Sequence, residues 1–164
     1  MNPLSVVART VCNLFAWFLA IFGIYVIVHG HLTPGGGFQG GAVVATFMAF
    51  LLVAHGGEKM QSWVRKDLFT LMECFGLTLF ISAGLLGMSK TFFFNFLAKA
   101  GGVFGGVLPI GPNAGALNTS GTIALMNLSV GIEVVGGLSM ILLYMFSAAH
   151  PQEPMGREES GHDR

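Results

Sequence analysis

The 164-residue sequence predicts an all-α, polytopic membrane protein with four transmembrane helices. Hydrophobic residues make up 53% of the chain and charged residues only 10%, against roughly 25% charged in an ordinary soluble domain. The few charges leave four long apolar gaps between them. Eight Lys and Arg balance eight Asp and Glu, so the chain lacks the basic surface that a nucleic-acid-binding protein uses to neutralise phosphates. High hydrophobicity and zero net charge exclude a disordered chain.

The four spans are placed at about residues 10–29, 38–56, 68–89 and 121–147. About 20 apolar residues cross a hydrocarbon core of roughly 30 Å. The first run is longer than the apolar region of a signal peptide, and it ends in His29-Gly30-His31 without a small-x-small cleavage pattern, so a retained anchor is expected. The second run is long enough only if the preceding Gly-rich segment joins its helix. The third and fourth are interrupted only by Glu73 and Glu133.

The distribution of Lys and Arg predicts that both termini face the cytoplasm. With four spans, six of these residues share the side of the termini, and only Lys90 and Lys99 lie on the other. A fifth span at 92–108 would bury Lys99 and export the basic tail, so a partly apolar outer connection between the third and fourth spans is preferred. We expect residues 1–150 to form the membrane domain and 151–164 a disordered cytoplasmic tail.

The strongest local pattern is the Gly-rich segment between the first two spans. Gly35, Gly37 and Gly40 formally match GxGxxG, but that dinucleotide-binding motif needs a preceding strand in a soluble βαβ unit. Two interpretations remain open. Either the segment only turns the chain, or its glycines allow close helix contact at GxxxG spacing, with Phe38 as a packing anchor. The candidate packing residues are Pro34, Gly35, Gly36, Gly37, Phe38, Gly40 and Gly41.

Glu133 and Glu73 are the candidates for ion chemistry, because an ionisable residue inside a span is costly and marks a functional site by default. Glu133 is expected near mid-depth, with Ser129, Gly136 and Gly137 on its face. Glu73 is expected nearer the cytoplasmic end. The alternative is that either carboxyl is structural and hydrogen-bonds across helices.

No other pattern points to chemistry. Cys12 and Cys74 lie in apolar runs, where free Cys behaves as a small hydrophobe. No CxxC or His/Cys cluster suggests a metal site, and no nucleophile and base arrangement suggests a hydrolase. We therefore expect no metal, no cofactor and no catalytic residue.

Two segments stand out as motifs. They are Gly30-His31-Leu32-Thr33-Pro34-Gly35-Gly36-Gly37-Phe38-Gln39-Gly40-Gly41 and the stretch from Ser120 to Gly137, which contains Glu133-Val134-Val135-Gly136-Gly137. Both resemble the B subunit of Mrp (Mnh)-type multisubunit sodium/proton antiporters. With the four-span layout, the similarity covers about residues 5–148. The resemblance implies a small subunit of a large assembly that exchanges Na⁺ for H⁺, in which larger subunits hold the main proton channels.

The sequence thus predicts a non-catalytic subunit of such an antiporter in the cell membrane. Its expected partners are other subunits, the lipid bilayer, and Na⁺ and H⁺ as transported ions. The alternative that the resemblance leaves open is a subunit of the ion-translocating module of a membrane-bound hydrogenase or related ferredoxin-dependent complex. A stand-alone channel is disfavoured, because the four spans contain no cationic partner for either Glu.

Overall fold

The computed structural model describes residues 4–33, 35–56, 60, 62–107 and 117–149. Four helices in this part of the chain are long and apolar enough to cross a membrane: α1 (Val6–Val28), α2 (Gly37–His55), α4 (Lys66–Leu86) and α5 (Thr122–Ala149). Two short 3₁₀ turns, η1 (Gly87–Ser89) and η2 (Leu117–Thr119), flank the outer connection. The predicted all-α, four-helix membrane fold is confirmed.

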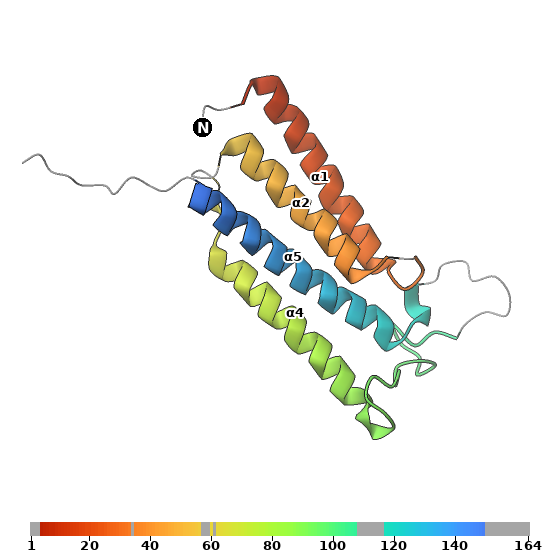
Figure 1. The fold of residues 1–164 in the computed structure, drawn as a ribbon. Coiled ribbons are helices and arrows are strands. Elements are labelled where there is room, and N and C mark those ends of the chain that lie inside the picture. Colours follow the sequence, from red (N-terminus) through yellow and green to blue (C-terminus); the bar gives the residue numbers. More distant parts are fainter. Residues whose placement is uncertain (1–3, 34, 57–59, 61, 108–116, 150–164) are drawn as a thin grey trace, which may run out of the picture.

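The helices lie side by side in the order α1, α2, α5, α4, so the last helix in sequence is inserted beside the second (Figure 1). Helix α2 packs against both α1 and α5, and α5 packs against both α2 and α4. Helices α1 and α4 are therefore the outer members. Helix α1 begins and α5 ends at the same end of the bundle, where α2 also ends and α4 begins (Figure 1). We call it the Arg9 end.

A small apolar core lies at the Arg9 end. Its buried members are Met48, Leu52, Met60 and Leu143. Most large apolar side chains elsewhere are exposed, and α1 shows this most clearly, with Leu14, Trp17 and Ile21 each more than 60% exposed. A helix that is apolar all round needs an apolar surrounding. In this chain that surrounding is lipid or other membrane helices.

The start of α2 explains how the second span reaches sufficient length. The helix begins at Gly37, so Gly37, Phe38, Gly40 and Gly41 are helical and the Gly-rich segment joins the span as required. The side-chain oxygen Oε1 of Gln39 accepts a hydrogen bond from the Gly36 amide at 2.8 Å. A side chain that satisfies a free amide at a helix start stabilises that boundary.

The outer connection is irregular in residues 90–107, and no helix forms in the described part of the disfavoured fifth span. Phe92 and Phe93 are exposed apolar side chains, and the Gly101 amide donates to the Gly105 carbonyl at 2.9 Å. Oδ1 of Asn95 accepts from the backbone amide of Thr122 at 2.8 Å and from its hydroxyl at 2.9 Å. This contact caps α5 and attaches the connection to it.

Two expectations fall wholly or partly outside the described residues. They are the role of Pro34 in the Gly-rich segment and the disordered tail at 151–164.

Candidate functional site

The two acidic residues lie on the line of contact between α4 and α5, which we call the α4–α5 seam. A methyl group at Gly76 of α4 would lie 2.7 Å from the backbone nitrogen of Glu133. A methyl group at Gly136 of α5 would lie 2.8 Å from the backbone nitrogen of Glu73. Each glycine therefore makes room for the backbone that carries the opposing carboxylic acid, as small residues do in membrane helix pairs.

Helical spacing directs both acidic side chains to one side of the seam. Glu133 and Gly137 are four residues apart and share a face of α5. A methyl group added at Gly137 would lie 3.6 Å from Oε1 of Glu73. The Glu73 carboxyl group therefore lies beside the same face of α5. Glu73 is exposed at the surface of the chain and Glu133 is half-buried. The seam therefore presents both acids toward whatever covers this face.

Neither acid is paired within the described part of this chain. No hydrogen bond or ion pair joins Glu73 or Glu133 to another described residue. The buried Ser129, one turn before Glu133, donates its hydroxyl to the Leu125 carbonyl of its own helix at 2.7 Å instead. An unpaired carboxyl at membrane depth can take up a proton, bind a cation or hydrogen-bond to a neighbouring helix.

The Gly-rich segment provides a second set of close contacts, within the chain. Gly37 and Gly41 face α5, where a methyl group at Gly41 would lie 2.8 Å from Cβ of Val134 and one at Gly37 would overlap the Asn127 carbonyl. Gly40 faces α1, and a methyl group at Gly40 would lie 2.8 Å from the Gly23 carbonyl oxygen. The glycines thus both end the turn and let α2 approach two helices.

GxxxG spacing also relates Gly36 to Gly40, but these two residues do not share a helix face, because Gly36 is the N-cap residue that precedes the first turn of α2. Gly35 also precedes the helix, and Phe38 is 63% exposed at the start of α2. Whether Phe38 anchors a partner stays a prediction.

Asn127 is a site residue that sequence reasoning did not single out. Its Oδ1 accepts a hydrogen bond from the Gly37 amide at 3.2 Å, which caps α2 from the neighbouring helix α5. Its amide group also fills the space beside Gly30 and Gly36, where methyl groups would lie 2.7 Å from Nδ2 and 2.5 Å from Oδ1. The sequence feature that could have identified Asn127 is its position as a lone amide side chain inside an apolar span.

The Cys, His, Asp and Glu residues do not assemble into a metal site in the described part of the chain. Cys12 and Cys74 are free thiols on different helices, and no group of three His, Cys, Asp or Glu side chains is close enough to hold a metal ion. Nδ1 of His29 lies 3.0 Å from the Tyr25 carbonyl of its own helix.

Sequence and structure comparisons identify relatives over most of the chain. Residues 7–140 match the family described as a domain related to the MnhB subunit of Na⁺/H⁺ antiporter. A Staphylococcus aureus protein named as antiporter subunit mnhB2 is 32% identical over 87% of this chain and 95% of its own length. A Methanocaldococcus jannaschii protein without an assigned activity is 32% identical over 74% of this chain.

A solved structure has the same fold. A chain of the membrane-bound sulfane sulfur reductase, an archaeal respiratory membrane complex, matches 88% of this chain with a TM-score of 0.70 and 31% identity. The present chain spans 59% of that chain and 44% of the M. jannaschii protein. With its four apolar helices, the protein is a multi-pass protein of the cell membrane, and it belongs to the family of domains related to the MnhB subunit of Na⁺/H⁺ antiporter.

Proposed function

We propose that this chain is a non-catalytic membrane subunit of a Mrp-type Na⁺/H⁺ antiporter, with roles in assembly and in an ion path. The observation that carries the proposal is the MnhB match over residues 7–140, together with a relative named as an antiporter subunit that is covered over 95% of its length. The excess of Lys and Arg that the sequence places at the start of α1, between α2 and α4 and after α5 supports a cytoplasmic position for both termini.

Glu133 is the first ion-path residue and Glu73 the second. Helical spacing directs their side chains to one side of the α4–α5 seam, and their carboxyl groups are unpaired among the described residues. A neighbouring subunit that covered this face would place them at an interface between chains, where a proton or Na⁺ could be passed on. No Lys or Arg occupies the interior of any of the four spans, so the larger subunits supply the rest of the path.

A second candidate function is supported by the structural match to a respiratory membrane complex. In that case the same chain belongs to an ion-translocating module that a redox reaction drives. Any redox cofactors would be held by other subunits, because no described group of side chains here suits a metal.

Ion exchange in everted membrane vesicles tests both proposals. Vesicles from the native host are compared with those from a strain that lacks this chain and from the complemented strain. An antiporter subunit predicts that added Na⁺ alone dissipates an imposed pH gradient, and that deletion removes this response. A redox-driven module predicts Na⁺ or H⁺ movement only with an electron donor. Unchanged ion movement after deletion, with and without donor, contradicts both.

A further inference from the structure

The contact between α1 and α2 contains an apolar pocket that the proposed function does not use. It is lined by Cys12 of α1 and by Ala49, Phe50 and Val53 of α2, and its volume is about 170 Å³. Every exposed lining atom is apolar, and the pocket is open to the outside of the chain. The ring of Phe15 stacks on Phe50 with centroids 6.4 Å apart. The pocket therefore suits a hydrocarbon chain that enters from the bilayer.

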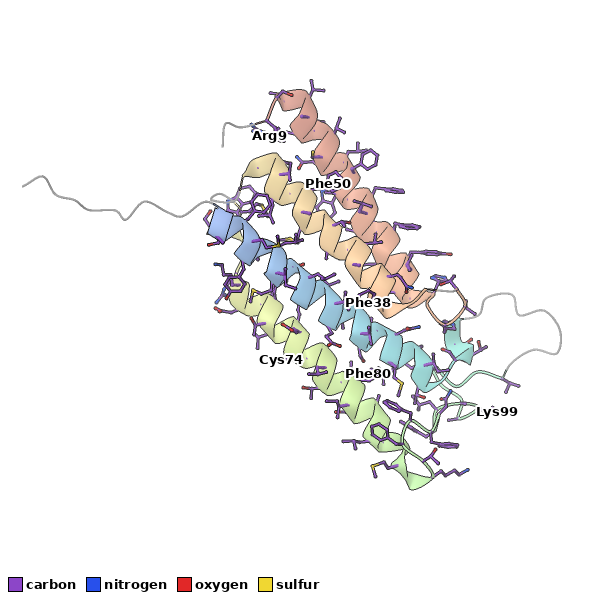
Figure 2. The ribbon with its side chains drawn as sticks, in the orientation of Figure 1. Arg9, Phe38, Phe50, Cys74, Phe80 and Lys99 are labelled. Atoms are coloured by element: carbon purple, nitrogen blue, oxygen red, sulfur yellow. The ribbon has the colours of Figure 1, made fainter. Side chains whose placement is uncertain are left out.

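A basic side chain lies next to this pocket. Arg9 is three residues before Cys12, so the two share a side of α1, and Figure 2 shows Arg9 near the start of that helix. One terminal nitrogen of Arg9 donates to the Leu4 carbonyl at 3.2 Å. Its Nε is buried and has no hydrogen-bond partner among the described residues, and no described carboxylate pairs with the guanidinium.

A second unsatisfied atom lies one turn further along α1. Oδ1 of Asn13 is buried and has no partner in the described part of the chain. Buried polar atoms without partners are uncommon in native proteins, and each indicates a missing ligand, water or neighbour. The Arg9 guanidinium is a donor that an anionic group can satisfy, whereas Oδ1 of Asn13 is an acceptor that a headgroup hydroxyl, and not the phosphate, would satisfy.

The depth of Arg9 fits a lipid headgroup. Helix α1 has 23 residues, or about 34 Å at the helical rise, against roughly 30 Å of hydrocarbon. Arg9 is the fourth residue of this helix, which places its guanidinium at the boundary with the headgroups. Basic pockets between transmembrane helices at this level bind anionic lipid headgroups.

We propose that the α1–α2 contact at the Arg9 end binds one anionic phospholipid. The phosphate accepts hydrogen bonds from the Arg9 guanidinium, and a segment of one acyl chain lies in the pocket formed by Cys12, Ala49, Phe50 and Val53. Positive charge at the boundary and apolar lining below it match the two parts of such a lipid. The inference depends only on the protein lying in a membrane, and it stands whether or not the antiporter proposal holds.

Photolabelling of the intact native complex tests this site. The complex is reconstituted in nanodiscs with trace phosphatidylglycerol that carries a diazirine on its acyl chain, or with phosphatidylcholine carrying the same chain. Labelled residues are identified by mass spectrometry. We expect Cys12 and residues 49–53 to be labelled about fivefold more by the anionic probe. Arg9→Gln should reduce labelling by the anionic probe to the level seen with the phosphatidylcholine probe.

Matched controls separate a specific anionic lipid from boundary lipid and from a covering subunit. Arg65→Gln removes an exposed charge at the same end and should leave the labelling unchanged. Unlabelled phosphatidylglycerol should compete with the probe, whereas inorganic phosphate should not. Equal labelling by both headgroups would show ordinary boundary lipid and overturn the proposal. Absence of labelling at the pocket would mean that a neighbouring subunit covers it, and this also overturns the proposal. Wild-type labelling of the Arg9→Gln complex would show that Arg9 does not bind the headgroup, and it would overturn the proposal.

Discussion

At the scale of single residues, the two acids of the α4–α5 seam differ in how far the chain surrounds them. Glu133 is half-buried on the inner helix α5, whereas Glu73 is exposed on the outer helix α4. A carboxyl closer to protein is shielded better from lipid and water, and its charge has a stronger effect on nearby ions. We therefore expect Glu133 to be the more sensitive position for transport.

Substitution of Glu133 by Gln tests this directly. The amide has nearly the same shape but cannot release a proton or carry a charge. We expect Glu133→Gln to lower Na⁺-dependent dissipation of a pH gradient in vesicles by at least tenfold, because one positioned proton-transfer group contributes about 10²- to 10⁴-fold. The amount of assembled complex, measured by co-purification, should stay at the wild-type level.

Glu73→Gln is the matched variant on the opposing helix. It should reduce exchange less than Glu133→Gln, because Glu73 lies at the exposed surface of α4. If Glu133→Gln exchanges Na⁺ normally and only loses stability, the carboxyl is structural and hydrogen-bonds across helices.

Asn127 makes a different kind of contribution, since its side chain joins two helices. Asn127→Ala removes the acceptor for the Gly37 amide and should destabilise the protein by about 1 kcal/mol, as the loss of a helix cap does. The melting temperature of the purified protein in detergent measures this. Thr78→Ala is the control, because the Thr78 hydroxyl bonds only to the Cys74 carbonyl of its own helix. Equal melting temperatures for both variants would show that the interhelical cap is not needed.

Sequence alone predicts part of this site and not the rest, for a physical reason. The protein-packed face of Glu133 follows from helical periodicity, which places Ser129 and Gly136 beside it. The contact of Asn127 with Gly37 joins residues that are 90 positions apart, and no local pattern encodes it. The direction in which each glycine faces also depends on which helices become neighbours, so Gly40 contacts α1 whereas Gly41 contacts α5.

At the scale of helix pairs, α4 and α5 offer a comparison between two adjacent glycines. A methyl group at Gly136 would lie 2.8 Å from backbone atoms of Phe69 and Glu73, whereas one at Gly137 would lie 3.6 Å from its nearest neighbour. Gly136→Ala should force the helices apart and cost about 1–3 kcal/mol. Gly137→Ala should be tolerated or slightly stabilising, since Ala favours a helix over Gly.

Thermal unfolding and vesicle transport together check this pair. Gly136→Ala should lower both the melting temperature and the rate of Na⁺/H⁺ exchange, because it displaces the backbone of Glu73 from α5. Gly137→Ala should keep the wild-type melting temperature. The same tolerance for both alanines would contradict the close approach of the two helix backbones.

The start of α2 allows packing within the chain to be separated from packing against a partner. Gly37→Leu places a large side chain against the Asn127 carbonyl, so both the melting temperature and the recovery of partner subunits should fall. Phe38→Ala alters a side chain that is 63% exposed. It should reduce recovery of partners and leave the melting temperature unchanged.

Those outcomes are measured by affinity purification of the tagged chain and by thermal unfolding of the chain itself. Full recovery of partner subunits with Phe38→Ala would show that Phe38 does not anchor a partner. Full recovery with Gly37→Leu would contradict the role of the Gly-rich segment in assembly.

At the scale of the whole molecule, the number of spans was predictable but their arrangement was not. Long apolar runs bounded by charges determine how many helices can cross a membrane, and α1, α2, α4 and α5 follow from them. The order α1, α2, α5, α4 depends on which glycine faces fit together, and composition does not reveal that (Figure 1). The capped outer connection through Asn95 is likewise a contact between segments distant in sequence.

The unpaired acids of the seam favour a chain that works inside an assembly, whereas the exposed apolar surface requires only an apolar surrounding. Affinity isolation of the tagged chain from its native membrane, in mild detergent and with mass spectrometry of its partners, tests that claim most directly. We predict a stoichiometric complex with larger membrane subunits that carry the proton channels. Recovery of the chain alone, active in Na⁺/H⁺ exchange after reconstitution, would contradict it.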